Sequence, residues 1–158
     1  MTGPGSGWAV VIPVKPGAVG KSRLHLADVD RVTLARAIAL DTIAAAAACS
    51  EVAQVFVVTD DARLLCISRT SGKIRWISQL KRWEDMKDKK GAVRWTGPIA
   101  AGGRLILVST DGDIVYANPA DGVIAASADL HHRMTLSPVV ADNMLYILAD
   151  DGRLTAYR

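Results

Sequence analysis

Residues 55–67 read Val55-Phe-Val-Val-Thr-Asp-Asp-Ala-Arg-Leu-Leu-Cys-Ile67, and the same pattern returns without a gap at 105–117 and at 145–157. Each copy has a run of β-branched and aliphatic residues, an acidic turn and a second apolar run, which is typical of two strands joined by a tight turn. Copies spaced by about forty to fifty residues are typical of stacked β units such as propeller blades. The repeat therefore predicts a mainly β fold with about two and a half blades of antiparallel sheet.

The residues between the copies complete a four-stranded unit. Glycine-containing turns at 69–73 and 118–122 follow the second apolar run, and a further strand follows each turn. Proline-containing strands at 96–100 and 137–141 precede the second and third copies. We therefore expect residues 62–158 to form propeller blades.

The first part of the chain follows a different pattern. The apolar run at 8–14 predicts a buried strand, residues 31–48 predict a helix, and residues 55–59 predict a second strand. Strand, helix and strand at this spacing predict a Rossmann-like βαβ fragment over residues 1–61. Residues 55–61 satisfy both patterns, so the two parts of the chain meet there.

The apolar runs at 8–14 and 31–49 each leave a second role open. The run at 8–14 does not resemble a signal peptide, because Pro13 interrupts it and neither a basic run nor a cleavage site flanks it. An alternative leader is a lipoprotein signal over residues 31–49, ending at Cys49. The run at 8–14 is also able to supply the outer strand of the last blade, although Pro13 restricts it to a sheet edge.

The loop that follows the first predicted strand contains a phosphate-binding element in outline. Gly20-Lys-Ser22 resembles the end of a P-loop. That motif requires a glycine five residues before Gly20, where this chain has Lys15. The spacing therefore excludes a P-loop.

Positive charge is concentrated in one segment. The formal net charge of +3 does not by itself indicate a nucleic-acid partner. Residues 81–94 hold six basic and three acidic residues around an aromatic side chain and a methionine. Such a loop between blades is typical of a protein-docking site, and a solvated loop is the open alternative. The predicted docking residues are Trp83, Met86, Lys87, Lys89, Lys90 and Arg94.

The cysteines and the paired histidines do not indicate a metal site. Cys49 and Cys66 are the only cysteines and have no CxxC spacing, so we expect two buried thiols, with a single disulfide as the alternative. His131 and His132 are adjacent, and neighbours on a strand point to opposite faces. We therefore expect surface histidines.

Four blocks in the first 61 residues resemble the start of the 2-phospho-L-lactate guanylyltransferases. The blocks are Trp8-Ala-Val-Val-Ile-Pro-Val-Lys-Pro16, Gly20-Lys-Ser-Arg-Leu24, Leu34-Ala-Arg-Ala-Ile-Ala-Leu-Asp-Thr42 and Val57-Val-Thr-Asp-Asp61. The resemblance implies a nucleotidyltransferase variant of the Rossmann-like fold that transfers GMP from GTP. It also implies nucleotide-phosphate contacts by Lys15, Lys21, Ser22 and Arg23.

This sequence departs from that family in two ways. Gly17 stands where a larger apolar residue is expected, and the later acidic positions that hold the family's metal ion have no counterpart. Phosphoryl transfer depends on metal-assisted neutralisation of charge. We therefore expect no catalytic residues and no GTP-dependent turnover, and GTP and Mg²⁺ enter only under the alternative of a GTP-binding or guanylyltransferase-like protein.

The remaining residues resemble quinoprotein-type (PQQ-like) β-propeller repeats. More narrowly, they are similar to the carboxy-terminal blades of the propeller lipoprotein that assists outer-membrane protein assembly. The blocks that carry this resemblance are Arg63-Leu-Leu-Cys-Ile-Ser-Arg-Thr-Ser-Gly-Lys-Ile-Arg-Trp76, Arg94-Trp-Thr-Gly-Pro98 and Asp150-Asp-Gly-Arg-Leu-Thr-Ala-Tyr-Arg158. The resemblance implies an all-β scaffold that binds partner proteins, performs no chemistry and holds no quinone.

Together these patterns predict a hybrid chain whose function is protein binding. The expected partner is the outer-membrane assembly machinery, or a second copy reached through open sheet edges. We expect no nucleic-acid partner and no direct insertion into a membrane. The sequence as written predicts a cytoplasmic chain, whereas the propeller resemblance implies a periplasmic, lipid-anchored one.

Overall fold

The structure is a computed structural model that describes residues 8–13, 30–50 and 52–158. Within these residues the chain forms one helix and a series of short strands. The first part contains β1 (Trp8–Pro13), α1 (Arg31–Ala48), β2 (Val52–Val58), β3 (Arg63–Ile67), β4 (Ile74–Gln79), β5 (Trp83–Asp85) and β6 (Lys90–Ala92). The second part contains β7 (Trp95–Ala101), β8 (Arg104–Ser109), β9 (Asp113–Ala117), β10 (Ile124–Asp129), β11 (Val139–Ala141), β12 (Met144–Leu148) and β13 (Leu154–Tyr157).

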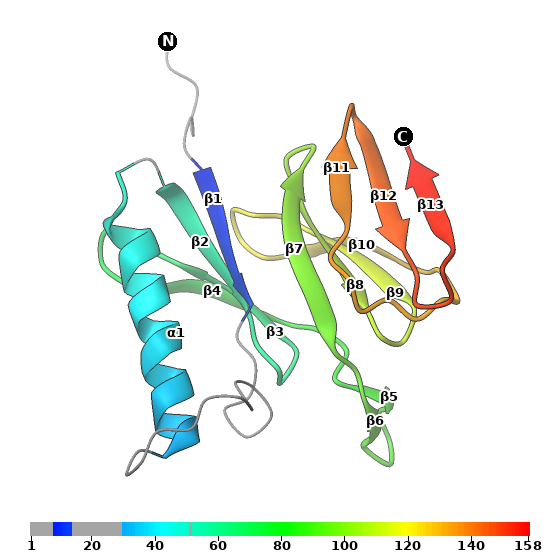
Figure 1. The fold of residues 1–158 in the computed structure, drawn as a ribbon, viewed down its shortest axis with the longest axis horizontal. Coiled ribbons are helices and arrows are strands. Elements are labelled where there is room, and N and C mark those ends of the chain that lie inside the picture. The colour runs from blue at the N-terminus through cyan, green and yellow to red at the C-terminus, as the bar shows by residue number, and fades with distance from the viewer. Residues whose placement is uncertain (1–7, 14–29, 51) are drawn as a thin grey trace.

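Apart from the two-stranded β5–β6 hairpin, the strands form three successive sheets that stand side by side (Figure 1). The first sheet has the order β1-β2-β3-β4, the second β7-β8-β9-β10, and the third β11-β12-β13. The three sequence copies form the hairpins β2–β3 and β8–β9 at the centre of the first two sheets and the hairpin β12–β13 in the third sheet. The mainly β, antiparallel architecture predicted from the repeat is confirmed.

The first sheet differs from the second in its innermost strand. In the second sheet that place belongs to β7, which runs antiparallel to β8. In the first sheet it belongs to β1, which pairs in parallel with β2, Val10 facing Val55 and Ile12 facing Val57. The suggestion that residues 8–14 supply the outer strand of the last blade is therefore wrong, and the observed third sheet has three strands.

The helix α1 connects β1 to β2 and lies against the first sheet. Asp30 caps its start, because a carboxylate oxygen of Asp30 accepts a hydrogen bond from the backbone N–H of Thr33 at 2.9 Å. The helix spans residues 31–48 as its sequence predicted. Ile43 and Ala46 pack on a buried cluster that includes Val55 and Val57 of β2. The helix thus covers the face of the first sheet that points away from the second sheet (Figure 1).

The opposite face of the first sheet packs against the second sheet. Phe56, Val58 and Leu64 form one buried cluster with Leu105 and Leu107. β2 is therefore buried on both faces, which explains its continuous run of apolar residues. A second cluster joins the second and third sheets through the side chains of Ile106, Val108, Ile114, Leu145, Ile147 and Met134.

Trp76 adds a polar contact between the first two sheets. Its ring packs against the shared core, and its Nε1–H donates to the carbonyl oxygen of Pro119 at 3.1 Å. The hydroxyl of Ser78 donates to the carbonyl oxygen of Gly122 in the same turn. The outer strand β4 is thereby attached to the β9–β10 turn. No helix among the described residues is long and apolar enough to cross a membrane.

Candidate docking surface

The basic segment that the sequence singled out folds into a hairpin of its own. β5 and β6 pair in antiparallel register, with Trp83 opposite Ala92 and Asp85 opposite Lys90. Oδ1 of Asp85 closes the turn by accepting from the backbone N–H groups of Lys87 and Asp88, at 2.9 and 3.0 Å. The hairpin projects away from the sheets (Figure 1), so its turn is presented to solvent.

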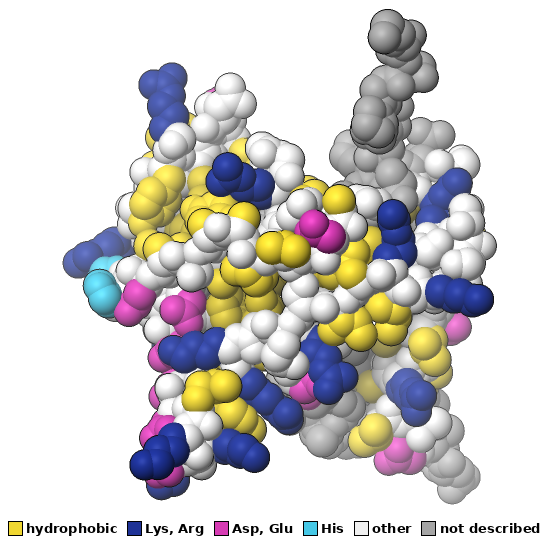
Figure 2. Space-filling model, turned by 180° about the vertical axis from the view of Figure 1, so that it is seen from behind, with side chains coloured by type: hydrophobic (Ala, Val, Ile, Leu, Met, Phe, Trp, Pro, Cys, Tyr) yellow, Lys and Arg dark blue, Asp and Glu magenta, His cyan; other side chains and the backbone are white. Residues whose placement is uncertain are grey.

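The hairpin carries an apolar group among charges. The side chain of Met86 is 61% exposed at the turn. Trp83 is half-buried, and the guanidinium carbon of Arg82 lies 5.3 Å from its ring centroid, which is within range of a cation–π contact. Figure 2 shows hydrophobic side chains flanked by Lys and Arg side chains over the hairpin, which lies at the lower left in that view.

Most of the predicted docking residues lie in the hairpin itself. Lys87, Lys89 and Lys90 are exposed there, and Nζ of Lys90 lies 3.5 Å from a carboxylate oxygen of Asp88. Arg94 instead lies at the base of the hairpin, where its backbone N–H donates to Oγ1 of Thr110 at 3.0 Å. Arg94 therefore joins the hairpin to the second sheet through its main chain, while its side chain is exposed.

An ion pair that the sequence analysis missed anchors the base of the hairpin. Nζ of Lys81 forms a salt bridge with Asp111 and lies 3.8 Å from a carboxylate oxygen of Asp113. The hydrogen bond to Asp111 raises the pKa of Lys81, and burial raises the pKa of Asp113. The available signal was the acidic Asp-Gly-Asp turn of the second repeat copy, but its partner is distant in sequence.

Trp95 and Val93 also fix the base of the hairpin. The indole N–H of Trp95 donates to the carbonyl oxygen of Lys81 at 2.8 Å. The backbone N–H of Val93 donates to the carbonyl oxygen of Arg82 at 3.0 Å, and the Val93 side chain is buried. The hairpin therefore combines a fixed base with an exposed turn.

The residues predicted to contact nucleotide phosphates cannot be placed. Lys15, Lys21, Ser22 and Arg23 lie outside the described residues. Their assignment rests on the sequence resemblance and stays a prediction.

The cysteines differ from expectation in one respect. Both thiols are free, but only Cys66 is buried, and burial raises the pKa of its thiol. Cys49 is exposed at the end of α1, where it is the C-cap residue. The expectation of two buried thiols is therefore wrong for Cys49.

The paired histidines lie in a bend after β10 and not on a strand. Nδ1 of His131 lies 2.9 Å from a carboxylate oxygen of Asp129, and the His131 side chain is 81% exposed. Nδ1 of His132 lies 3.2 Å from Asp151, and its Nε2 lies 2.7 Å from a guanidinium nitrogen of Arg153. Within the described part of the chain no group of three or more His, Cys, Asp or Glu residues is placed to hold a metal ion.

Stacked sheets of three or four strands with shared inter-sheet cores define a β-propeller blade repeat, and sequence comparison identifies its kind. A profile of the family described as Outer membrane protein assembly factor BamB matches residues 79–158, just over half of the chain. The chain belongs to this family. The BamB of Alkalilimnicola ehrlichii is 32% identical over 107 residues, which are 66% of this chain and 25% of that protein.

Solved structures agree on the fold of this part. BamB from Moraxella catarrhalis superimposes with a TM-score of 0.53 at 22% identity, over 66% of this chain and 29% of that one. The computationally designed Ika4 protein superimposes with a TM-score of 0.50 at 16% identity, over 66% of this chain and 59% of that one. At these identities the likeness shows the fold alone.

The first part of the chain is similar to a different group of proteins. Phosphoenolpyruvate guanylyltransferase of Streptomyces coelicolor is 57% identical over 58 residues, and that of Salinispora arenicola is 54% identical over 56 residues. These matches cover 35% and 34% of this chain and 27% and 26% of the relatives. The guanylyltransferase resemblance is confirmed, although the names of these relatives specify phosphoenolpyruvate and not 2-phospho-L-lactate. The chain spans about a quarter of the length of the curated relatives it matches.

Proposed function

We propose that this chain is a non-catalytic protein-binding scaffold of the outer-membrane assembly propeller type. The observation that carries the proposal is the β5–β6 hairpin, which belongs largely to the segment matched by the BamB profile and projects from it. The remaining fold is a set of stacked sheets that holds the hairpin in place. The partner that this family membership favours is the machinery that assembles outer-membrane proteins.

The hairpin has the features of a small binding anchor. Interface energy is concentrated in a few aromatic, arginine or other large apolar groups that become desolvated on binding. Met86 and Trp83 supply the apolar contact, and the surrounding lysines favour a partner surface with acidic groups. Because the base is fixed by Lys81 and Trp95, little conformational entropy is lost when the turn is held by a partner.

The test is a binding titration with purified outer-membrane protein assembly machinery from which its own BamB has been removed. Substitution Met86→Asp places a charge in the apolar contact, so we expect affinity to fall at least fivefold, about 1 kcal/mol. Met86 is mostly exposed, so the substitution leaves the fold intact, which thermal melting checks. The control is Val123→Asp, because Val123 is 59% exposed on a turn outside the hairpin. Equal affinities for wild type and Met86→Asp would contradict the docking role.

A second candidate function rests on the guanylyltransferase match. We propose that the β1–α1–β2 segment is a fragment of the nucleotidyltransferase fold, supported by the parallel pairing of β1 and β2 around the connecting helix. In such sheets ligands bind beyond the carboxyl ends of the strands, and residues 14–29 follow the carboxyl end of β1 in the sequence. Under this alternative, Lys15, Lys21, Ser22 and Arg23 bind the phosphates of GTP with Mg²⁺.

A melting experiment separates the two candidates. If the segment binds GTP, Mg-GTP raises the melting temperature, and Lys21→Ala abolishes the shift while Lys73→Ala, in the turn between β3 and β4, keeps it. Formation of a guanylylated product from GTP and phosphoenolpyruvate would show that the chain is an enzyme. The scaffold proposal predicts neither a shift nor a product.

A further inference from the structure

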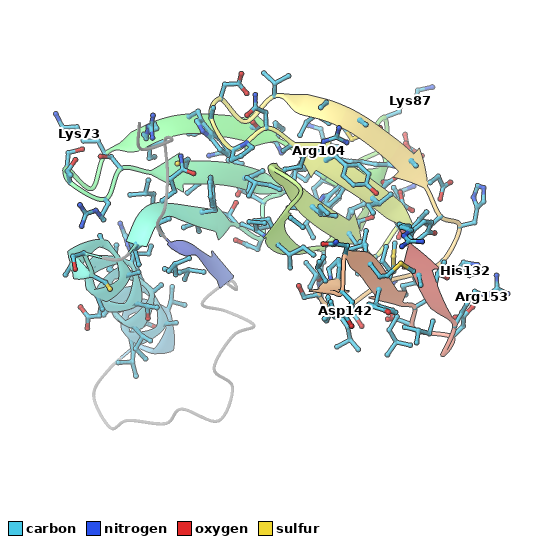
Figure 3. The ribbon with its side chains drawn as sticks, turned by 90° about the horizontal axis from the view of Figure 1, so that it is seen from above. Lys73, Lys87, Arg104, His132, Asp142 and Arg153 are labelled. Atoms are coloured by element: carbon cyan, nitrogen blue, oxygen red, sulfur yellow. The ribbon has the colours of Figure 1, made fainter. Side chains whose placement is uncertain are left out.

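We infer that the outward face of the third sheet is a self-association surface on which a second copy of this chain packs face to face. The outward face is the one that points away from the second sheet. In Figure 3, α1 lies on one flank of the three sheets and the third sheet lies on the other. The inference is independent of the hairpin, which lies elsewhere on the molecule.

The residues of the outward face are apolar apart from the hydroxyl of Tyr146. Leu145 and Ile147 of β12 point inward and are buried against the second sheet, so the residues between them point outward. Residues directly opposite in an antiparallel pair share a face, which extends the outward set to β11 and β13. The set is Val139, Ala141, Met144, Tyr146, Leu148, Leu154 and Ala156.

Within the described residues, Val139, Leu148 and Leu154 of this set are exposed, and Met144 and Tyr146 are half-buried. The side chains of Val139, Leu148 and Leu154 are 58%, 41% and 64% exposed. A contiguous apolar face of this kind is typical of an interaction surface.

The outward face continues a series of interfaces that the molecule already uses. Tyr146 and Leu148 correspond in the repeat to Ile106 and Val108, which pack in the cluster between the second and third sheets. The same positions of the first copy are Phe56 and Val58, which pack in the cluster between the first and second sheets. Two of the three equivalent faces are therefore covered by another sheet, and the third has the same apolar character.

The position of α1 decides how a second copy is able to cover this face. Within the stack, the face of one sheet that carries the residues equivalent to Tyr146 and Leu148 meets the face of the next sheet that carries the residues equivalent to Leu145 and Ile147. In the first sheet the equivalent face carries Val55 and Val57, and α1 covers it through Ile43 and Ala46. Head-to-tail stacking of copies is thereby blocked. Two outward faces are then left to meet each other, and such an isologous contact closes at a dimer.

The size of the face sets the strength of the dimer. Three strands of three to five residues cover roughly 250 Å² per copy at ordinary strand spacing. A stable interface of standard size buries about 800 Å² per partner. We therefore expect a weak dimer that forms at high protein concentration and dissociates on dilution.

Sedimentation of the full chain across about 5–500 µM tests the inference. We expect the weight-average mass to rise from monomer to dimer and to stop there. Leu154→Lys and Leu148→Lys place charges on the face and should keep the chain monomeric at every concentration. Val123→Lys is the matched control, because an equally exposed valine in another part of the surface should leave dimerisation unchanged. Melting curves check that each variant folds.

A cross-link reports the geometry directly. Tyr146 lies in the middle of the central strand, close to where a twofold axis would pass. In a Cys49→Ser background, Tyr146→Cys should form a disulfide-linked dimer when copper phenanthroline oxidises the two thiols, whereas Val123→Cys should not. A monomer at all concentrations, a dimer that survives Leu154→Lys, or a ladder of larger species would overturn the inference.

Discussion

Single residues show how neighbouring sheets are held together. Gly72 and Gly122 occupy the same place in two equivalent turns, with φ of +65° and +76°. A Cβ on Gly72 would meet nothing within 4 Å, whereas a Cβ on Gly122 would collide with the ring of Trp76 and the hydroxyl of Ser78. Both positions therefore favour glycine because φ is positive, and only Gly122 also needs a residue without a side chain because its neighbours are close.

This difference gives a matched pair of substitutions. Gly72→Ala should lower the free energy of unfolding by about 1–2 kcal/mol, because alanine is strained at positive φ. Gly122→Ala should cost about 1–3 kcal/mol more, because the added methyl group displaces Trp76 from the contact between the sheets. Urea unfolding of the two variants and the wild type measures both quantities. Equal losses would mean that the Trp76 contact contributes nothing to stability.

The sequence pattern predicted the exposed residues of the β5–β6 hairpin better than the contacts at its base. Trp83, Met86 and the lysines stand out in the sequence because charged and apolar residues mix there without the alternation of a buried strand. The ion pair of Lys81 with Asp111 could not be predicted, because it forms only after two sheets stack. Local sequence composition predicts which side chains are exposed. The contacts that side chains make between sheets depend on the tertiary fold.

At the level of elements, the sequence predicted α1 and β1 but not the residues on which α1 packs. The bounds of α1 followed from its cap at Asp30 and its run of helix formers. Its position against Val55 and Val57 did not follow, because the helix is apolar on several sides and has no distinct face. The parallel pairing of β1 with β2 agrees with the strand, helix and strand pattern of the sequence, whereas a Rossmann-like fold for this segment stays a prediction.

β2 is the element that joins the two parts of the chain. It pairs in parallel with β1 and in antiparallel register with β3, and both of its faces are buried. An apolar strand without a polar face is compatible with either neighbour, which explains why residues 55–61 satisfy two sequence patterns. The assignment of residues 1–61 and 62–158 to separate domains stays a prediction.

In the whole molecule, β1 and α1 occupy positions that a strand and a neighbouring blade occupy in a propeller. β1 occupies the innermost position that β7 holds in the second sheet, and α1 covers the face on which a preceding blade would stack. Repeat stacks need their terminal faces covered, and here a helix does so at one end. The guanylyltransferase-like segment is thus part of the same packed body as the blades, and within the described residues the third sheet exposes Val139, Leu148 and Leu154.

The measurement that tests this account most directly is native-state hydrogen exchange of the full chain, followed by mass spectrometry of peptides covering 8–13, 31–48 and 105–117. If β1 and α1 complete the first sheet, the amides of β1 and α1 should be protected and should exchange together with those of β8 and β9. Exchange of β1 and α1 within seconds, while β8 and β9 stay protected for hours, would show that the first segment is not part of the stack.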